Sequence, residues 1–193
     1  TSRAHLLLDG ITETHFQSKE LPPLKQNSEQ LMDCLAKFHA FWWNHSRLGV
    51  DVGAFPDNES IGIGFGRLCS LKFLRERLSR FADFLGERLS LERRNLYERA
   101  LSSFPNLKDR QGRKRYKAGN HLTIIHGDLN PGNVFFPHDH TKDKLFIIDW
   151  AVWDIRIGTD DLAYMYVLWW LPERRAALEK DLIKRYHDGL LMH

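Results

Sequence analysis

Apolar side chains recur at helical spacing in the first half of the chain, with polar residues filling the positions between them. The first series lies at offsets of four, seven and eleven residues and falls on one helical face: Leu31, Leu35, Phe38 and Trp42. It predicts a helix over 28–45. Asn27, with Gln30 three residues later, resembles a capping box and predicts that the helix begins there.

Two further helices are predicted before the chain becomes strongly charged. Apolar residues repeat at helical spacing over 71–85, which predicts an amphipathic helix. Ser90 is a favoured N-cap residue, so a third helix is expected from Ser90 through about Leu101. The Gly-rich, polar stretch 49–66 predicts a loop, and 108–120 predicts an exposed, charged linker.

The C-terminal part of the chain predicts two more helices. Thr159 is expected to cap a strongly apolar helix over 160–170, which Pro172 should stop. A last amphipathic helix follows, and Gly189 is its expected C′ residue. Its apolar face carries Leu178, Leu182 and Tyr186.

Between these helical regions the pattern changes to short, continuous apolar runs. Residues 122–125 predict a buried strand. The runs 133–136 and 144–149 predict the two strands of a hairpin, joined by the polar segment 137–143. The run 5–11 predicts one more short buried strand. The expected fold class is α+β, mostly helical with a small β-hairpin among the helices.

Composition narrows the class of protein without identifying it. A chain of 193 residues with 42% hydrophobic and 27% charged residues suits one soluble domain with a sizeable core. The formal charge of +3 is too small to indicate a nucleic-acid partner. No apolar run approaches the roughly 18–20 residues that span a bilayer, and the chain does not open with a secretory leader. Neither a nucleic acid nor a membrane is therefore an expected partner.

The two cysteines bear on the compartment. Cys34 and Cys69 form no CxxC pair and lie among apolar residues. Buried free thiols of this kind are typical of a reducing environment, so a cytoplasmic protein is expected.

The stretch 124–136, IIHGDLNPGNVFF, places polar side chains at the edges of two apolar runs. Asp128 and Asn133 lie five residues apart across a tight Pro-Gly turn, and Asp149 ends the next predicted strand. Phosphoryl transfer with Mg²⁺ needs one or two oxygen ligands and a carboxylate that orients the attacking hydroxyl. These three side chains are expected to converge at one end of the hairpin and to supply those groups.

The same stretches resemble a known superfamily. HGDLNPGN, followed by IIDW and then IGTDDLAYM, is similar to the C-terminal lobe of the aminoglycoside phosphotransferase and choline kinase-like superfamily. Those enzymes phosphorylate hydroxyls of small molecules with ATP. LAKFHAFWW, residues 35–43, resembles the helix that precedes the catalytic region in that superfamily. The resemblance extends over about residues 5–188 and is strongest over 121–167.

Carried over position by position, the resemblance implies a role for five residues of the catalytic region. Asp128 matches the catalytic base, and Asn133 and Asp149 match the magnesium ligands. His126 and Asp161 match residues that support the catalytic loop structurally. The implied cofactor is Mg²⁺, and the implied acceptor is a hydroxyl of a small molecule.

The resemblance also implies a nucleotide pocket, with ATP as the phosphoryl donor. Its candidate residues come from a hinge-like segment and from the hairpin: Leu8, Asp9, Gly10, Ile11, Phe135 and Ile148. The first four resemble the hinge whose backbone holds adenine. Of the last two, Phe135 or Ile148 is expected to contact the adenine face from below.

Departures from the protein kinase pattern favour the small-molecule branch. Asn130 stands where protein kinases carry a lysine, and Asp149-Trp150-Ala151 replaces Asp-Phe-Gly. No glycine-rich loop or strand lysine precedes residue 5, so the N-terminal lobe is expected to be absent.

The expected architecture is therefore a single C-terminal lobe of a protein kinase-like fold over 1–193. We expect it to be a truncated piece that is inactive alone, and the alternative is an inert remnant of such an enzyme. It divides into a hinge-like strand at 1–11, a helical region at 28–105, the catalytic loop and metal-binding hairpin at 121–150, and C-terminal helices at 159–190.

Two other functions remain open at this point. One is a catalytically inactive, pseudokinase-like module that binds nucleotide. The other is a metal-dependent phosphoesterase, which needs several His and Asp ligands around two ions, whereas the sequence has no companion DxH or GNH motif.

Several polar stretches are expected to be structural. GIGFG at 62–66 lacks the spacing of a phosphate loop, and the basic run 114–117 is typical of a solvated loop. His138, Asp139 and His140 are expected in a solvated hairpin tip. His39 is expected to be a core histidine whose hydrogen bonds are satisfied.

Overall fold

The computed structural model describes residues 10–55, 71–111 and 118–193. The chain falls into two compact units, one formed by Thr1–His45 with Thr123–His193 and the other by Ser46–Leu122. The predicted site residues that the structure describes all belong to the first unit.

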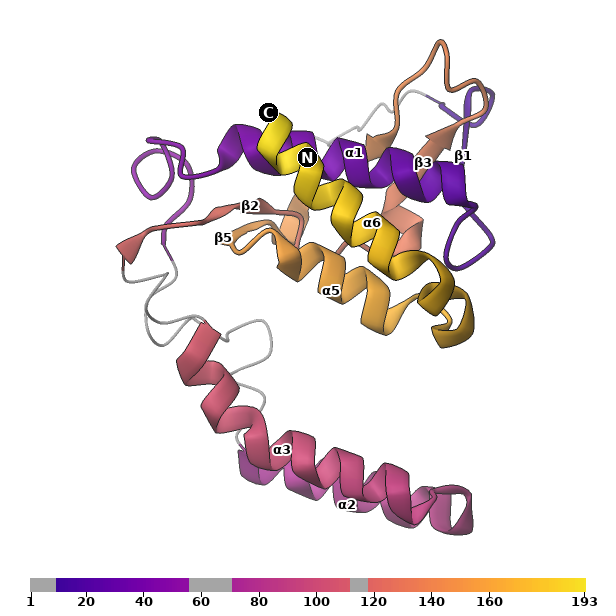
Figure 1. Ribbon diagram of the computed structural model, residues 1–193, viewed down its shortest axis with the longest axis vertical. Coiled ribbons are helices and arrows are strands. Elements are labelled where there is room, and N and C mark those ends of the chain that lie inside the picture. The colour runs from indigo at the N-terminus through magenta and orange to yellow at the C-terminus, as the bar shows by residue number, and fades with distance from the viewer. Residues whose placement is uncertain (1–9, 56–70, 112–117) are drawn as a thin grey trace, which may run out of the picture. The chain divides into compact units, whose positions relative to one another are not determined.

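Three helices form the framework of the first unit. α1 (Lys25–Trp42) packs against α6 (Pro172–Met192), and α5 (Thr159–Leu168) precedes α6 along the chain (Figure 1). Their apolar faces meet the β3 strand and the turn that follows Asp128 in one core. The most deeply buried members of that core are Leu31, Met32, Leu35, Ala36, Leu129, Phe136 and Leu182. Leu129 follows Asp128 directly, so the turn is anchored by an apolar side chain with no exposed surface.

Two small antiparallel sheets complete this unit. β1 (His15–Phe16), β3 (Val134–Pro137) and β4 (Phe146–Ile147) form a sheet in the order β1-β3-β4. β2 (Thr123–Ile125) pairs with β5 (Asp154–Arg156), with Ile124 opposite Ile155. The predicted hairpin and the predicted strand at 122–125 are thus confirmed in shorter form.

The sequence did not indicate β1 or β5. Each is only two or three residues long, too short to show an alternating pattern, and each forms because a neighbouring strand offers its free edge. The strand predicted over 5–11 lies outside the described residues except for Gly10 and Ile11, which are not in a strand.

The first helix begins earlier than the capping box predicted. α1 starts at Lys25 with Leu24 as its N-cap, and no side chain caps it. Asn27 and Ser28 lie buried within the first turn, where the Ser28 hydroxyl donates to the Pro23 carbonyl at 3.1 Å. The capping-box prediction is wrong because the backbone N–H of Ser28 already bonds to the Leu24 carbonyl, one turn before the predicted start.

The ends of the last two helices also differ from expectation. Gly158, not Thr159, is the N-cap of α5, which ends at Leu168. Pro172 begins α6 instead of stopping α5, a position where proline is well tolerated because the first helical N–H has no partner. Gly189 does not end α6, which continues to Met192.

The position of Gly189 explains why a glycine lies inside this helix. A Cβ at Gly189 would stand 2.7 Å from the Cβ of Ala36 on α1, so the two small residues let the helices approach closely.

Gly189→Ala is therefore expected to destabilise the protein, although alanine normally stabilises a helix interior by about 1 kcal/mol relative to glycine. The clash with Ala36 should cost more, about 1–3 kcal/mol, as overpacking of a filled core does. Chemical denaturation followed by circular dichroism would measure the loss. Adding Ala36→Gly to Gly189→Ala should restore much of the stability, and an unchanged or raised midpoint for the single variant would contradict the packing argument.

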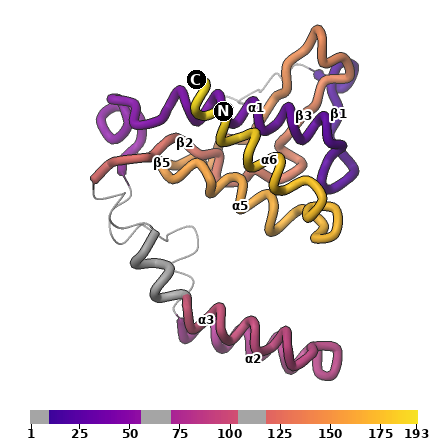
Figure 2. The backbone as a smooth tube through the Cα atoms, viewed as in Figure 1, coloured from indigo at the N-terminus to yellow at the C-terminus, as the bar shows by residue number. Residues whose placement is uncertain are grey.

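The second unit is built on a helical hairpin. α2 (Leu71–Leu85) and α3 (Leu91–Gln111) pack along one another, as the backbone trace shows (Figure 2). The backbone N–H of Arg93 donates to the Ser90 hydroxyl at 3.3 Å, which confirms Ser90 as the start signal, and α3 extends ten residues beyond the predicted Leu101. In the described residues, no helix has the length and apolarity needed to cross a bilayer.

Candidate active site

The loop that follows β2 carries the HGD motif, and its geometry requires the central glycine. Gly127 has φ of +81°, a left-handed conformation that residues with a side chain rarely adopt. A Cβ at this position would also lie 2.4 Å from the Val152 carbonyl oxygen. Glycine is thus the residue that lets the loop turn against the segment after β4.

Asp161 lies beneath this loop and binds its backbone with both carboxylate oxygens. Oδ2 accepts the His126 N–H at 2.8 Å, and Oδ1 accepts the Gly127 N–H at 2.9 Å. The side chain is 1% exposed, so its charge is compensated by these two dipoles instead of by water. α5 thereby fixes the backbone that leads into Asp128.

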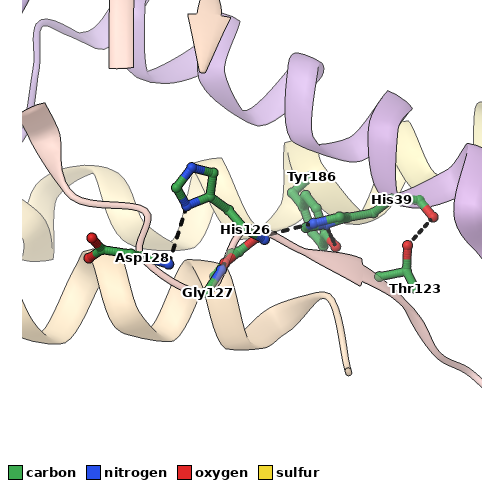
Figure 3. A network of polar contacts seen from close by, with 7 residues as sticks. His39, Thr123, His126, Gly127, Asp128 and Tyr186 are labelled. Carbon is green, nitrogen blue, oxygen red and sulfur yellow. Dashed lines mark hydrogen bonds and ion pairs between the residues drawn. The ribbon is translucent and has the colours of Figure 1, made fainter. Parts of the chain in front are cut away.

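His39 contacts Asp161, and Tyr186 contacts His39; the sequence did not assign either residue to the site. His39 on α1 is fully buried, with Nε2 3.4 Å from Asp161 Oδ2 and Nδ1 2.7 Å from the Tyr186 hydroxyl (Figure 3). Burial raises the pKa of Tyr186, so the phenol keeps its proton beside Nδ1.

The prediction that His39 is a satisfied core histidine is correct only in part. Its Nδ1 has a hydrogen bond, but its Nε2 approaches Asp161 without the alignment of one. Gly158 makes room for this pair, because a Cβ there would lie 2.6 Å from the Tyr186 hydroxyl and 2.9 Å from His39 Nδ1.

His126 links the loop to the end of β4. Its Nε2 lies 2.8 Å from the Ile148 carbonyl oxygen, and its Nδ1 accepts the Asp128 N–H at 3.2 Å. A carbonyl can only accept and an amide N–H can only donate, so the ring is the neutral tautomer with hydrogen on Nε2. This side chain, wholly buried, ties the backbone of Asp128 to the residue that precedes Asp149.

The Asp128 carboxylate is partly exposed and accepts a hydrogen bond from Tyr164 on α5. The Tyr164 hydroxyl donates to Oδ1 at 2.7 Å. This bond is the main reason that the pKa of Asp128 is lowered, against a smaller opposing effect of burial. Asp128 therefore carries its charge at neutral pH. The sequence analysis missed Tyr164, although its place three residues after Asp161 on a predicted helix puts both on one face.

The turn after Asp128 is held by its own amide side chains. Asn130 Oδ1 accepts the Gly132 N–H at 2.8 Å, at the start of a 3-10 helix over Pro131–Asn133, and the Gln17 side chain donates to the Gly132 carbonyl. Asn133 is 8% exposed, and its Nδ2 donates to the Asp128 carbonyl at 2.9 Å. Because the carbonyl needs a donor, the amide oxygen of Asn133 is the atom left without a partner.

Asp149 lies next to Asn133 at the end of the hairpin. The backbone N–H of Ile148 donates to the Asn133 carbonyl at 3.0 Å, so the two segments run side by side up to these residues. Asp149 has φ of 62°, which is uncommon for a residue other than glycine and is often seen at functional sites. Among the described residues, no hydrogen bond or ion pair engages its exposed carboxylate.

Asn133 and Asp149 together suit one magnesium ion. Both offer an oxygen that no described protein group uses, and Mg²⁺ takes one or two protein oxygens while keeping waters and substrate phosphates. The residues that the structure describes contain no group of three or more His, Cys, Asp or Glu arranged to hold a metal.

The hairpin brings two of the candidate nucleotide residues onto one surface. Phe135 pairs with Phe146 across the strands, and Ile148 lies two residues further along, while Val134 and Phe136 face the core. Phe146 and Ile148 are both more than two-fifths exposed. Phe135, Phe146 and Ile148 thus form an outward apolar face beside Asp149.

The structure describes two of the four hinge-like candidates, Gly10 and Ile11. Leu8 and Asp9 lie outside the described residues. Gly10 is exposed, and the Ile11 carbonyl accepts the N–H groups of Thr14 and His15, which turns the chain into β1.

The other polar stretches that were expected to be structural are the segments 62–66 and 114–117 and the hairpin tip at 138–140. The segments 62–66 and 114–117 lie outside the described residues. At the hairpin tip, Asp139 accepts the N–H of Thr141, and the tip is held to α1 by a contact of 3.0 Å between His140 Nδ1 and Gln30 Oε1.

Comparison with known proteins identifies the family. Residues 2–193 match the ecdysteroid kinase-like family. No curated protein and no solved structure matched the sequence. The mixed architecture of helices with small antiparallel sheets is compatible with a kinase-like fold. The chain belongs to the ecdysteroid kinase-like family, within the protein kinase-like and choline kinase-like superfamily, and is thus a kinase-like phosphotransferase by descent.

Proposed function

We propose that the chain forms the C-terminal, catalytic lobe of a kinase that transfers the γ-phosphoryl group of ATP to a hydroxyl of a small molecule. One observation carries this proposal: two unused oxygens, from Asn133 and Asp149, lie at adjoining strand ends next to the ionised Asp128. Membership of the family supports the reaction class.

Each residue of the site has a distinct part in this reaction. The Asp128 carboxylate orients the acceptor hydroxyl and takes up its proton as the oxygen attacks phosphorus. Asn133 and Asp149 would hold Mg²⁺, which when bound neutralises charge on the phosphoryl oxygens. His126 and Asp161 keep the loop backbone rigid, so the carboxylate is in place before the substrate arrives.

The outward apolar face of the hairpin is the proposed floor for the adenine ring. Phe135, Phe146 and Ile148 present the kind of surface on which a flat heterocycle stacks, and they adjoin the residues proposed to hold the metal. We place the reaction in the cytoplasm, where ATP is abundant and the thiol of Cys34 stays reduced.

The test is an acceptor screen with the full-length protein that contains this chain, with ecdysteroids as the first acceptors because the family name suggests them. ADP release that depends on an acceptor, and a phosphorylated product seen by ³¹P NMR, are expected only with Mg²⁺ present. Asp149→Asn should raise the Mg²⁺ concentration needed for half-maximal rate by about tenfold or more, because it removes a charged ligand.

Two outcomes would replace the proposal. Nucleotide binding without turnover over a broad panel of alcohols would favour the pseudokinase-like module. Hydrolysis of phosphate esters in the absence of nucleotide would favour a phosphoesterase.

The metal affinity of Asp149→Asn can also be measured independently of turnover, by following the binding of Mn²⁺ in place of Mg²⁺ with electron paramagnetic resonance.

A further inference from the structure

α5 holds the catalytic loop at two points, one turn apart. Asp161 binds the loop backbone before Asp128, and Tyr164, three residues later on the same helical face, binds the carboxylate of Asp128 itself. The first contact is structural. The second touches the atoms that the proposed reaction would use.

The other contacts of Asp128 act mostly on its main chain, and the side-chain amides of Asn130 and Asn133 act on its carboxylate more weakly than Tyr164 does. His126 Nδ1 accepts its N–H, and Asn133 Nδ2 donates to its carbonyl. The last torsion of an aspartate side chain has a broad, nearly two-fold preference, so main-chain contacts alone do not select one carboxylate orientation. The 2.7 Å bond from Tyr164 to Oδ1 does select one.

The direction of this hydrogen bond is settled by the protonation states. Tyr164 keeps its proton, since its hydrogen bond with Asp128 raises the pKa of the phenol, followed by the smaller effect of burial. A carboxylate can only accept, so the phenol hydrogen of Tyr164 points to Oδ1 of Asp128.

We propose that Tyr164 is a positioning residue for the catalytic base: it holds Oδ1 of Asp128, so that Oδ2 is the oxygen that receives the proton of the acceptor hydroxyl. The inference rests on the proposed function, because it assigns a task to Tyr164 only if Asp128 acts as the base. It predicts a residue that affects the chemical step without contacting nucleotide.

The deciding variant is Tyr164→Phe in the full-length protein, assayed with a working acceptor. Loss of a hydrogen bond to a charged group should lower kcat about 10–100-fold. The KM for ATP should stay unchanged, because the ring remains and the nucleotide residues are elsewhere. Tyr166→Phe is the matched control, since its hydroxyl reaches Met32 Sδ in the core at 3.4 Å, and its kcat should equal that of the unaltered protein.

A second measurement separates positioning from a general effect on the fold. In an Asp128→Asn background, Tyr164→Phe should cause no further loss of residual turnover, because it acts through that carboxylate. A merely structural role would lower the rate by the same factor in both backgrounds.

The results distinguish this inference from the function on which it rests. Turnover that Asp128→Asn abolishes and Tyr164→Phe leaves at its full value overturns the inference alone. Equal losses from Tyr164→Phe in both backgrounds also overturn it. Absence of turnover with every acceptor overturns the proposed function, and the inference with it.

Discussion

Asp128→Asn in the full-length protein is expected to lower the kcat of phosphoryl transfer by about 10²–10⁴-fold, the usual contribution of a general base. The amide keeps the shape of the carboxylate but cannot accept the proton of the acceptor hydroxyl. Steady-state kinetics with a coupled ADP assay would measure the loss. The KM for ATP should change little, since Asp128 is not among the residues proposed to hold the nucleotide.

The structure indicates that this variant keeps its fold. An amide oxygen at position 128 can still accept the Tyr164 hydroxyl, and the contacts of its backbone with His126 and Asn133 are unaffected. An unchanged thermal midpoint would therefore assign the loss to chemistry.

The matched control is Asp139→Asn at the tip of the β3–β4 hairpin. The pKa of Asp139 is also lowered, chiefly by a hydrogen bond from the Thr141 side chain, so both variants remove an ionised carboxylate from the hairpin region. Asp139 lies away from the catalytic turn, and its variant should keep the full rate. Full turnover by Asp128→Asn, or an equal loss in both variants, would remove the basis for Asp128 as the base.

The turn between Asp128 and Asn133 could be predicted from the sequence because neighbouring residues encode it. Asn130 caps the turn, Pro131 begins it and Gly132 closes it, all within the segment that joins Asp128 to Asn133. Asp149 comes next to Asn133 because the two strands form a hairpin, which is also a local feature.

What the sequence did not indicate depends on contacts between distant segments. Tyr164 is 36 residues from Asp128, and Tyr186 is 147 residues from His39. Neither tyrosine stands out in an amphipathic helix, where such a residue is usually core. Gly189 was misread for the same reason: its place as a helix terminator is a local rule, while its true role depends on Ala36 across the α1–α6 interface.

The buried carboxylate of Asp161 yields the largest expected effect on stability. Asp161→Ala would leave the N–H groups of His126 and Gly127 without an acceptor and would remove the partner of His39 Nε2. Removing one member of a buried polar network of this kind should lower the free energy of unfolding by about 3–5 kcal/mol. Denaturant unfolding followed by tryptophan fluorescence would measure it, since Trp150 packs on the His126 ring at 4.7 Å.

The neighbouring residue Asp160 provides a control with the same side chain on the same turn of α5. Burial raises the pKa of Asp160, and nearby Arg156 only partly opposes this. A carboxyl group whose folded pKa is raised costs stability once the pH exceeds its unfolded pKa, so Asp160→Asn at neutral pH should leave stability unchanged or raise it. The free energy of unfolding of Asp161→Asn should lie between those of Asp161→Ala and Asp160→Asn. Its amide oxygen can accept one loop N–H, while its NH₂ group faces the other. A similar midpoint for Asp161→Ala and Asp160→Asn would show that the loop does not depend on this carboxylate. It would then follow that the rigidity of the Asp128 backbone comes from His126 and Leu129 instead.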